Sequence, residues 1–168
     1  MVRVWIYERV LYVEYEAYGL GVEIDHTPAL FDAIPEARDY VTRGDNSRPE
    51  TISYMVRAGF KKMLACRKWP GCVEDRVAYI RSFDRVVIHP RCPHTAQEAR
   101  LWSFKVDRLT GDVMPQLLDL HNHTWDAIGY ALEPMVLGYT KRVERKTPLD
   151  DEEMLMKSFG PQNNSWLG

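Results

Sequence analysis

Three side chains in two separate parts of the chain could together perform metal-dependent chemistry. Asp45 lies in the polar segment GDNSRPE, and His123 and Asp126 lie three residues apart in HNHTWDAIGYAL. Residues with this spacing share one face of a helix, so His123 and Asp126 can reach the same ion or water. Asp45 precedes a predicted helix, whose N-terminus favours anions such as phosphate. Each pattern also fits a simpler role, as a turn aspartate or as the polar face of an amphipathic helix.

The three side chains would together suit Mg²⁺ or Mn²⁺, which prefer carboxylate oxygen, with imidazole more acceptable to manganese. Two carboxylates about 4 Å apart repel by roughly 4 kcal/mol at an effective dielectric of about 20, so a bound cation best holds such a cluster together. That cation would activate water and stabilise a leaving alkoxide in phosphodiester hydrolysis. A second hypothesis is a nucleophilic Cys92 beside His89 or His94, and its alternative is a structural cysteine.

The composition is that of an ordinary globular domain. The 168 residues are 45% hydrophobic and 27% charged, with a formal net charge of -2. These values exclude a chain that is disordered throughout and a uniformly basic nucleic-acid coat. Three cysteines without a CxxC pair argue against a disulfide framework or structural zinc, and without a GxxxxGK[ST] motif we expect no ATPase motor in this chain. With no long apolar run and no cleavable leader visible, we expect a cytoplasmic location.

The elements that must position the three residues alternate between strands and helices. Alternating apolar residues over 2–17 predict a hairpin, and Thr27 with Pro28 opens a helix that Pro35 ends or bends. The remaining pattern predicts three short strands, near 40–41, 60–65 and 85–89. It predicts helices over 50–57, 73–80 and 121–136, and a further helix opened by a capping box at 95–98. A hairpin is predicted to join 102–106 with 113–118. This order predicts an α/β fold with a mixed sheet flanked by helices, in which Asp45 lies just beyond a strand end.

The sequence also suggests where the domain ends and where phosphate could bind. We place the domain at 1–138, followed by a polar, solvated tail at 139–168. Basic residues without an intervening acid concentrate at Arg57, Lys61, Lys62, Arg67 and Lys68. A second cluster contains only one acid, Glu144, among Lys141, Arg142, Arg145 and Lys146. Both a solvated surface and a phosphate-binding patch are consistent with such clusters.

Four stretches, in chain order, carry a resemblance to a known family: YVEYEAYGLGVEID, GDNSRPETISYMVRAGF, IHPRCPHT and HNHTWDAIGYAL. They resemble the C-terminal nuclease domain of tailed-phage terminase large subunits, over roughly 2–134. The resemblance implies a ribonuclease-H-like fold and a divalent-metal endonuclease that cuts concatemeric viral DNA during genome packaging. It also implies that Asp45, His123 and Asp126 belong to the acidic metal centre, with Mg²⁺ or Mn²⁺ as cofactor.

The same resemblance implies the partners of the protein. It makes double-stranded DNA the substrate and gives five basic residues a role in DNA binding: Lys61, Lys62, Arg67, Lys68 and Lys105. It further implies a portal, a small terminase subunit and an ATPase domain on a separate or missing chain, all in the cytoplasm of a bacterial host cell.

The sequence departs from the family pattern in two ways that limit the activity that we expect: the ATPase domain that normally precedes the nuclease is not seen, and neither is the first nuclease strand. The family's domain begins with a strand that carries the first metal-binding aspartate, whereas here Met1 is followed at once by the counterpart of the second strand. Asp25 lies after the hairpin and cannot substitute. We therefore expect weak or no cleavage by this chain alone, because metal positioning is most of the catalysis. The alternatives are a non-catalytic fragment that binds DNA or a packaging partner, a prophage remnant, and an unrelated metal phosphohydrolase.

Overall fold

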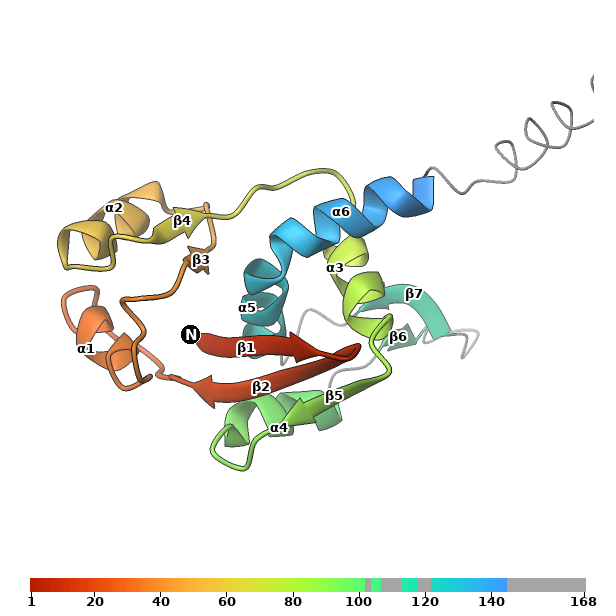
Figure 1. The fold of residues 1–168 in the computed structure, drawn as a ribbon, viewed down its shortest axis with the longest axis horizontal. Coiled ribbons are helices and arrows are strands. Elements are labelled where there is room, and N and C mark those ends of the chain that lie inside the picture. The colour runs from red at the N-terminus through yellow and green to blue at the C-terminus, as the bar shows by residue number, and fades with distance from the viewer. Residues whose placement is uncertain (102–103, 107–112, 118–121, 145–168) are drawn as a thin grey trace, which may run out of the picture. The chain divides into compact units, whose positions relative to one another are not determined.

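The computed structural model of the protein describes residues 1–101, 104–106, 113–117 and 122–144, with the side chains of 104–106, 113–117 and 140–144 left aside (Figure 1). The chain divides into two units, Met1–Glu133 and a second unit that begins at Pro134. No helix in these described ranges is long and apolar enough to cross a membrane.

The first unit opens with the predicted hairpin, which is confirmed. Strand β1 (Val2–Tyr7) pairs antiparallel with β2 (Val10–Glu16). The turn residues Glu8 and Arg9 have φ angles of 45° and 62°, as a two-residue hairpin turn with matching twist requires.

A third strand makes this sheet mixed. Strand β5 (Arg85–Ile88) pairs parallel with β2, so β2 lies in the middle of the sheet (Figure 1). Leu11 and Val13 of β2 are buried, whereas Trp5 and Tyr7 of β1 are exposed. The strand predicted over 85–89 and the mixed α/β class are thereby confirmed.

A second, two-stranded sheet carries the segment with Asp45. Strand β3 (Thr42–Gly44) pairs parallel with β4 (Met63–Ala65), and helix α2 (Pro49–Arg57) connects them. Both strands begin later than the sequence predicts. Phe60 is not in β4, because the chain first turns at Gly59, whose φ is 110°, and the Phe60 N–H donates to the carbonyl of Met55.

The remaining helices follow the predicted order with different bounds. Helix α1 (Thr27–Phe31) is a single short turn of helix, and α3 (Cys72–Arg81) and α4 (Pro93–Leu101) flank β5 in the sequence. Strands β6 (Phe104–Val106) and β7 (Val113–Leu117) form the predicted antiparallel pair, while the turn predicted between them lies outside the described residues.

Two predictions about helix ends are wrong. The single helix over 121–136 is two helices, α5 (His123–Ala131) and α6 (Glu133–Glu144), with the break at Leu132. Pro134 has no N–H group to donate to the carbonyl four residues before it and its ring crowds that carbonyl, so α5 cannot continue through it and the proline lies in the first turn of α6. The capping box at 95–98 does not form, because α4 already begins at Pro93 and both predicted capping side chains bond to other elements.

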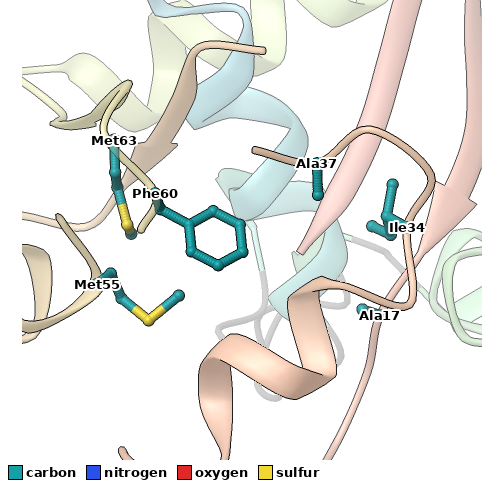
Figure 2. Packing of buried hydrophobic residues seen from close by; sticks show 6 residues of the cluster. All are labelled: Ala17, Ile34, Ala37, Met55, Phe60 and Met63. Atoms are coloured by element: carbon teal, nitrogen blue, oxygen red, sulfur yellow. The ribbon is translucent and has the colours of Figure 1, made fainter. Parts of the chain in front are cut away.

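A buried cluster holds the second sheet beside the end of the hairpin. It contains Ala17, Ile34, Ala37, Met55, Phe60 and Met63 (Figure 2). Figure 2 shows the Phe60 ring between the two methionines and the pair Ala37 and Ile34. The ring also meets Phe31 edge-on, at 5.8 Å between centroids. This packing fixes α2 and β4, and with them the loop that carries Asp45.

Helix α5 is the element that connects the parts of the first unit. It contacts β1 and β3, which belong to different sheets, and also α3 and α4. Helix α5 therefore lies beside β3, the strand that Asp45 follows.

Candidate metal centre

Asp45 directly follows β3 and makes two contacts through one oxygen. Its Oδ1 accepts a hydrogen bond from the Ser47 N–H at 3.1 Å and pairs with Lys68 Nζ at 2.8 Å. Partial burial raises the pKa of Asp45, but the hydrogen bonds from Lys68 and Ser47 outweigh burial, so the pKa lies below its usual value. Asp45 is thus a turn aspartate, and its ionised carboxylate is already paired with the Lys68 ammonium group.

His123 and Asp126 lie in the first turn of α5, as the spacing predicts. Asn122 is the N-cap residue, and the Asp126 N–H donates to its carbonyl at 2.8 Å. His123 is exposed and Asp126 is half-buried. A carboxylate in the first turn of a helix is stabilised by the helix dipole.

Asp45 follows β3 and Asp126 lies on α5, which are neighbouring elements, and both residues lie near Tyr130. The pKa of Tyr130 is raised to about 12, mainly by burial and also by the charges of Asp126 and Asp45. Cys66 links the two elements. Its N–H donates to the carbonyl of Gly44, the residue before Asp45, at 2.8 Å, and its Sγ contacts the carbonyl of Tyr130 at 3.7 Å. One carboxylate comes from the end of a strand and the other from a helix, 81 positions apart by number (126 minus 45).

Glu133 is a buried carboxylate that sequence reasoning missed. Its side chain is 1% exposed, and it accepts hydrogen bonds from Arg43 Nη1 at 3.3 Å and from the Arg67 N–H at 3.2 Å. It therefore ties β3 and the chain after β4 to the end of α5. In the sequence, a glutamate before a proline looks like an ordinary helix start, and nothing local indicates its remote partners.

Arg76 of α3 packs against Gly129 and Tyr130 of α5. It is buried, and its guanidinium lies over the Tyr130 ring at 4.8 Å and over the Trp69 ring at 5.6 Å. Its stem crosses Gly129 so closely that an added Cβ there would lie 2.9 Å from Arg76 Cδ. The Nε of Arg76 has no hydrogen-bond partner among the residues that the structure describes. The cation therefore stabilises the position of Tyr130 mainly through its ring face.

The two carboxylates fit a hard divalent ion, but no three-ligand group is formed. Within the described ranges, no three His, Cys, Asp or Glu side chains lie close enough to hold one metal ion. Mg²⁺ is commonly held by one or two carboxylates together with water, and the donor set of Asp45 and Asp126 matches that chemistry. The assignment of Asp45, His123 and Asp126 as ligands stays a prediction.

The thiol of Cys92 is unsuited to act as a nucleophile. It is fully buried, and its Sγ contacts the carbonyl of Val13 at 3.8 Å. Burial raises the pKa of Cys92 to about 11, which keeps the thiol protonated near neutral pH. The neighbouring histidines bond elsewhere, His89 to Arg91 and His94 to Glu16. The structure favours the structural role of this cysteine.

The residues predicted to bind DNA differ in their contacts with the rest of the protein. Lys61 and Lys62 are exposed after α2, and Lys62 Nζ donates to the carbonyl of Asp39 at 2.6 Å. The Arg67 side chain is 79% exposed, with Nε 3.6 Å from Glu133, whereas Lys68 is bound to Asp45. Lys105 belongs to β6, and its side chain lies outside the described part, as do the side chains of the cluster that starts at Lys141. Their role in DNA binding stays a prediction.

Comparisons with known proteins agree with this fold. A family model described as "Terminase RNAseH like domain" matches residues 2–134. The large terminase nuclease domain from bacteriophage SPP1, solved with bound Mn, matches with a TM-score of 0.72 and 28% identity over 79% of this chain and 76% of that one. This likeness confirms the ribonuclease-H-like fold.

Two curated proteins are also similar. The large terminase subunit of Bacillus phage SPP1 is 34% identical over 127 residues, which cover 69% of this chain and 29% of that protein. The PBSX phage terminase large subunit of Bacillus subtilis is 24% identical over 139 residues, which cover 83% of this chain and 31% of that protein. This chain thus matches about a third of the length of these relatives. The family match over residues 2–134, together with the shared fold, shows that the chain belongs to the terminase ribonuclease-H-like domain family.

Proposed function

We propose that this chain is a terminase nuclease domain that hydrolyses phosphodiester bonds in double-stranded viral DNA with Mg²⁺ or Mn²⁺. The observation that carries the proposal is the packing of α5, which carries Asp126, beside β3, which Asp45 follows. Cys66 links the two elements through its contacts with the carbonyls of Gly44 and Tyr130. The family match and the Mn-bound structural relative support it.

In this proposal each residue has a distinct task. Asp45 and Asp126 would hold the metal ion, and His123, one helical turn before Asp126, would add a nitrogen ligand. When bound, the ion would lower the pKa of a water molecule and stabilise the leaving oxygen. Tyr130, like any tyrosine, is protonated near neutral pH, and its hydroxyl would donate a hydrogen bond in this region. The exposed Lys61 and Lys62 would contact backbone phosphates.

The wider assembly is proposed from the family. The curated relatives are large terminase subunits of which this chain matches about a third, so packaging itself is a function of the whole machine. We propose the portal, the small terminase subunit and an ATPase domain on another chain as partners, within the bacterial cytoplasm. We also propose 1–138 as the extent of the nuclease domain.

A second candidate function is a non-catalytic module that binds DNA or a packaging partner. Two observations favour it. No three-ligand metal group exists among the described residues, and Lys68 already pairs with Asp45. Such a module would bind DNA with a strong salt dependence but would neither bind Mn²⁺ through Asp45 nor cut.

Plasmid nicking combined with Mn²⁺ titration calorimetry separates the two functions. The variants are Asp45→Asn and Asp126→Asn, and Asp39→Asn is the matched control because its side chain is exposed in the chain before β3. We expect slow nicking of supercoiled plasmid at protein excess, together with Mn²⁺ binding, both lost in the first two variants and kept in the control. A folded protein that binds DNA but shows neither Mn²⁺ binding nor nicking would establish the non-catalytic alternative.

A further inference from the structure

The Lys68 ammonium group already occupies the Asp45 carboxylate. Its Nζ lies 2.8 Å from Asp45 Oδ1 and donates to Ser47 Oγ at 2.6 Å. The Ser47 N–H donates to the same Oδ1 at 3.1 Å. Oδ1 of Asp45 therefore accepts two donors, one of which carries a full positive charge.

The surroundings of Lys68 fix its backbone but leave its tip in contact with solvent. The preceding residue, Arg67, is held by its N–H bond to the buried Glu133 carboxylate. The Lys68 side chain itself is 45% exposed, and that of Asp45 is 43% exposed. A lysine stem is long and flexible, so the ammonium group can leave Asp45 while the backbone stays in place.

We propose that Lys68 is an internal counter-ion that competes with the divalent metal for Asp45, so that the metal binds by displacing the ammonium group. This inference rests on the proposed function. A dication and an ammonium group at one carboxylate oxygen repel each other, so they exclude each other there. Lys68 thus neutralises Asp45 in the metal-free protein and lowers the metal affinity of the site. Once displaced, the same ammonium group is available to a DNA phosphate, which agrees with the DNA-binding role predicted for Lys68.

Mn²⁺ titration calorimetry on the full chain tests this competition. Lys68→Met removes the charge and keeps an unbranched stem, while Lys68→Arg keeps the charge. Arg48→Met is the matched control. It removes an exposed positive charge from the loop that carries Asp45, and Arg48 forms no ion pair with Asp45 among the described residues. Circular dichroism and thermal melting of each variant confirm that the fold is retained, as the half-exposed position of Lys68 predicts.

We expect Lys68→Met to tighten Mn²⁺ binding by about two- to fivefold, the effect of losing one half-exposed ion pair. Lys68→Arg and Arg48→Met should remain within about twofold of wild type. Mn²⁺ binding that appears only in Lys68→Met would equally support the competition. If Asp45→Asn loses Mn²⁺ binding but Lys68→Met binds no more tightly than wild type, Lys68 is not a competitor and the metal site stands. If neither wild type nor Lys68→Met binds Mn²⁺, both this inference and the proposed metal site are wrong.

Discussion

Glu133 accepts a hydrogen bond from Arg43, a residue 90 positions earlier in the chain, at 3.3 Å. The same carboxylate accepts the Arg67 N–H at 3.2 Å. One buried group therefore holds β3 and the chain that follows β4 to the end of α5. Because Asp45 follows β3 and Asp126 lies on α5, Glu133 helps to fix the distance between the two predicted metal ligands.

Removing this carboxylate should destabilise the protein. Glu133→Ala leaves Arg43 and the Arg67 N–H without their acceptor, so we expect the free energy of unfolding to fall by about 3 kcal/mol. Urea denaturation followed by circular dichroism measures the change. Glu23→Ala is the control, because this exposed glutamate should cost no more than about 0.5 kcal/mol. Equal losses in the two variants would contradict the role of Glu133.

Gly129 should tolerate no side chain while Arg76 is present. The Cβ of Gly129→Ala would meet Arg76 Cδ at 2.9 Å, and the buried arginine cannot move away without losing its contact with Tyr130. Overpacking of this kind costs about 1–3 kcal/mol, which exceeds the gain of about 1 kcal/mol in helix propensity. We therefore expect a net loss of about 1 kcal/mol.

A double-mutant cycle identifies the source of that loss. In an Arg76→Ala background the clash is absent, so Gly129→Ala should become neutral or stabilising there. Urea unfolding of the four proteins gives the coupling energy. The same loss in both backgrounds would show that Arg76 is not the obstacle.

Glu16 should make stability depend on pH. Its carboxylate, 4% exposed at the end of β2, accepts hydrogen bonds from the N–H groups of His94 and Thr95, both at 2.8 Å, and so caps α4. Burial raises the pKa of Glu16, but the bonds from Thr95 and His94 lower it, and the pKa lies below its usual value. A lowered pKa means stabilisation that is complete above the unfolded-state pKa and is lost as the pH falls through the folded-state pKa.

Glu16→Gln should therefore reduce stability near neutral pH by about 1.5–3 kcal/mol, the range for hydrogen bonds to a charged group. The difference from wild type should shrink at acidic pH, as the wild-type carboxylate takes up a proton through its lowered folded-state pKa. Urea unfolding at both pH values checks this. A difference that stays constant with pH would mean that the charge of Glu16 contributes nothing to the cap.

The basic segment after α2 should contribute to the salt dependence of DNA binding. Each phosphate contact that is lost reduces the slope of log K against log salt by about 1. We expect a shallower slope for Lys61→Glu and for Lys62→Glu, measured by fluorescence anisotropy with duplex DNA. Arg85→Glu, an exposed change of equal charge in β5, should leave the slope unchanged. An unchanged slope in both lysine variants would exclude this segment from the DNA interface.

The sequence predicted the elements whose signals are local. The hairpin of β1 and β2, strand β5 and helix α2 follow from alternating apolar residues, turn residues and a proline at a helix start. One wrong prediction arose where a local pattern was overridden by contacts with remote residues. The capping box at 95–98 satisfied a local pattern, but Thr95 bonds to Glu16 and Glu98 bonds to Thr124, because those remote groups are nearer in the folded chain.

By itself, then, the sequence determined the order of strands and helices and placed Asp45 beyond a strand and Asp126 on a helix with His123. Only the tertiary structure decided that Glu133 holds β3 to α5, that Arg76 packs on Gly129, and that Lys68 pairs with Asp45. The reason is that each of these contacts joins residues that lie tens of positions apart, which only the packing of the elements brings together. Local periodicity carries no information about that packing.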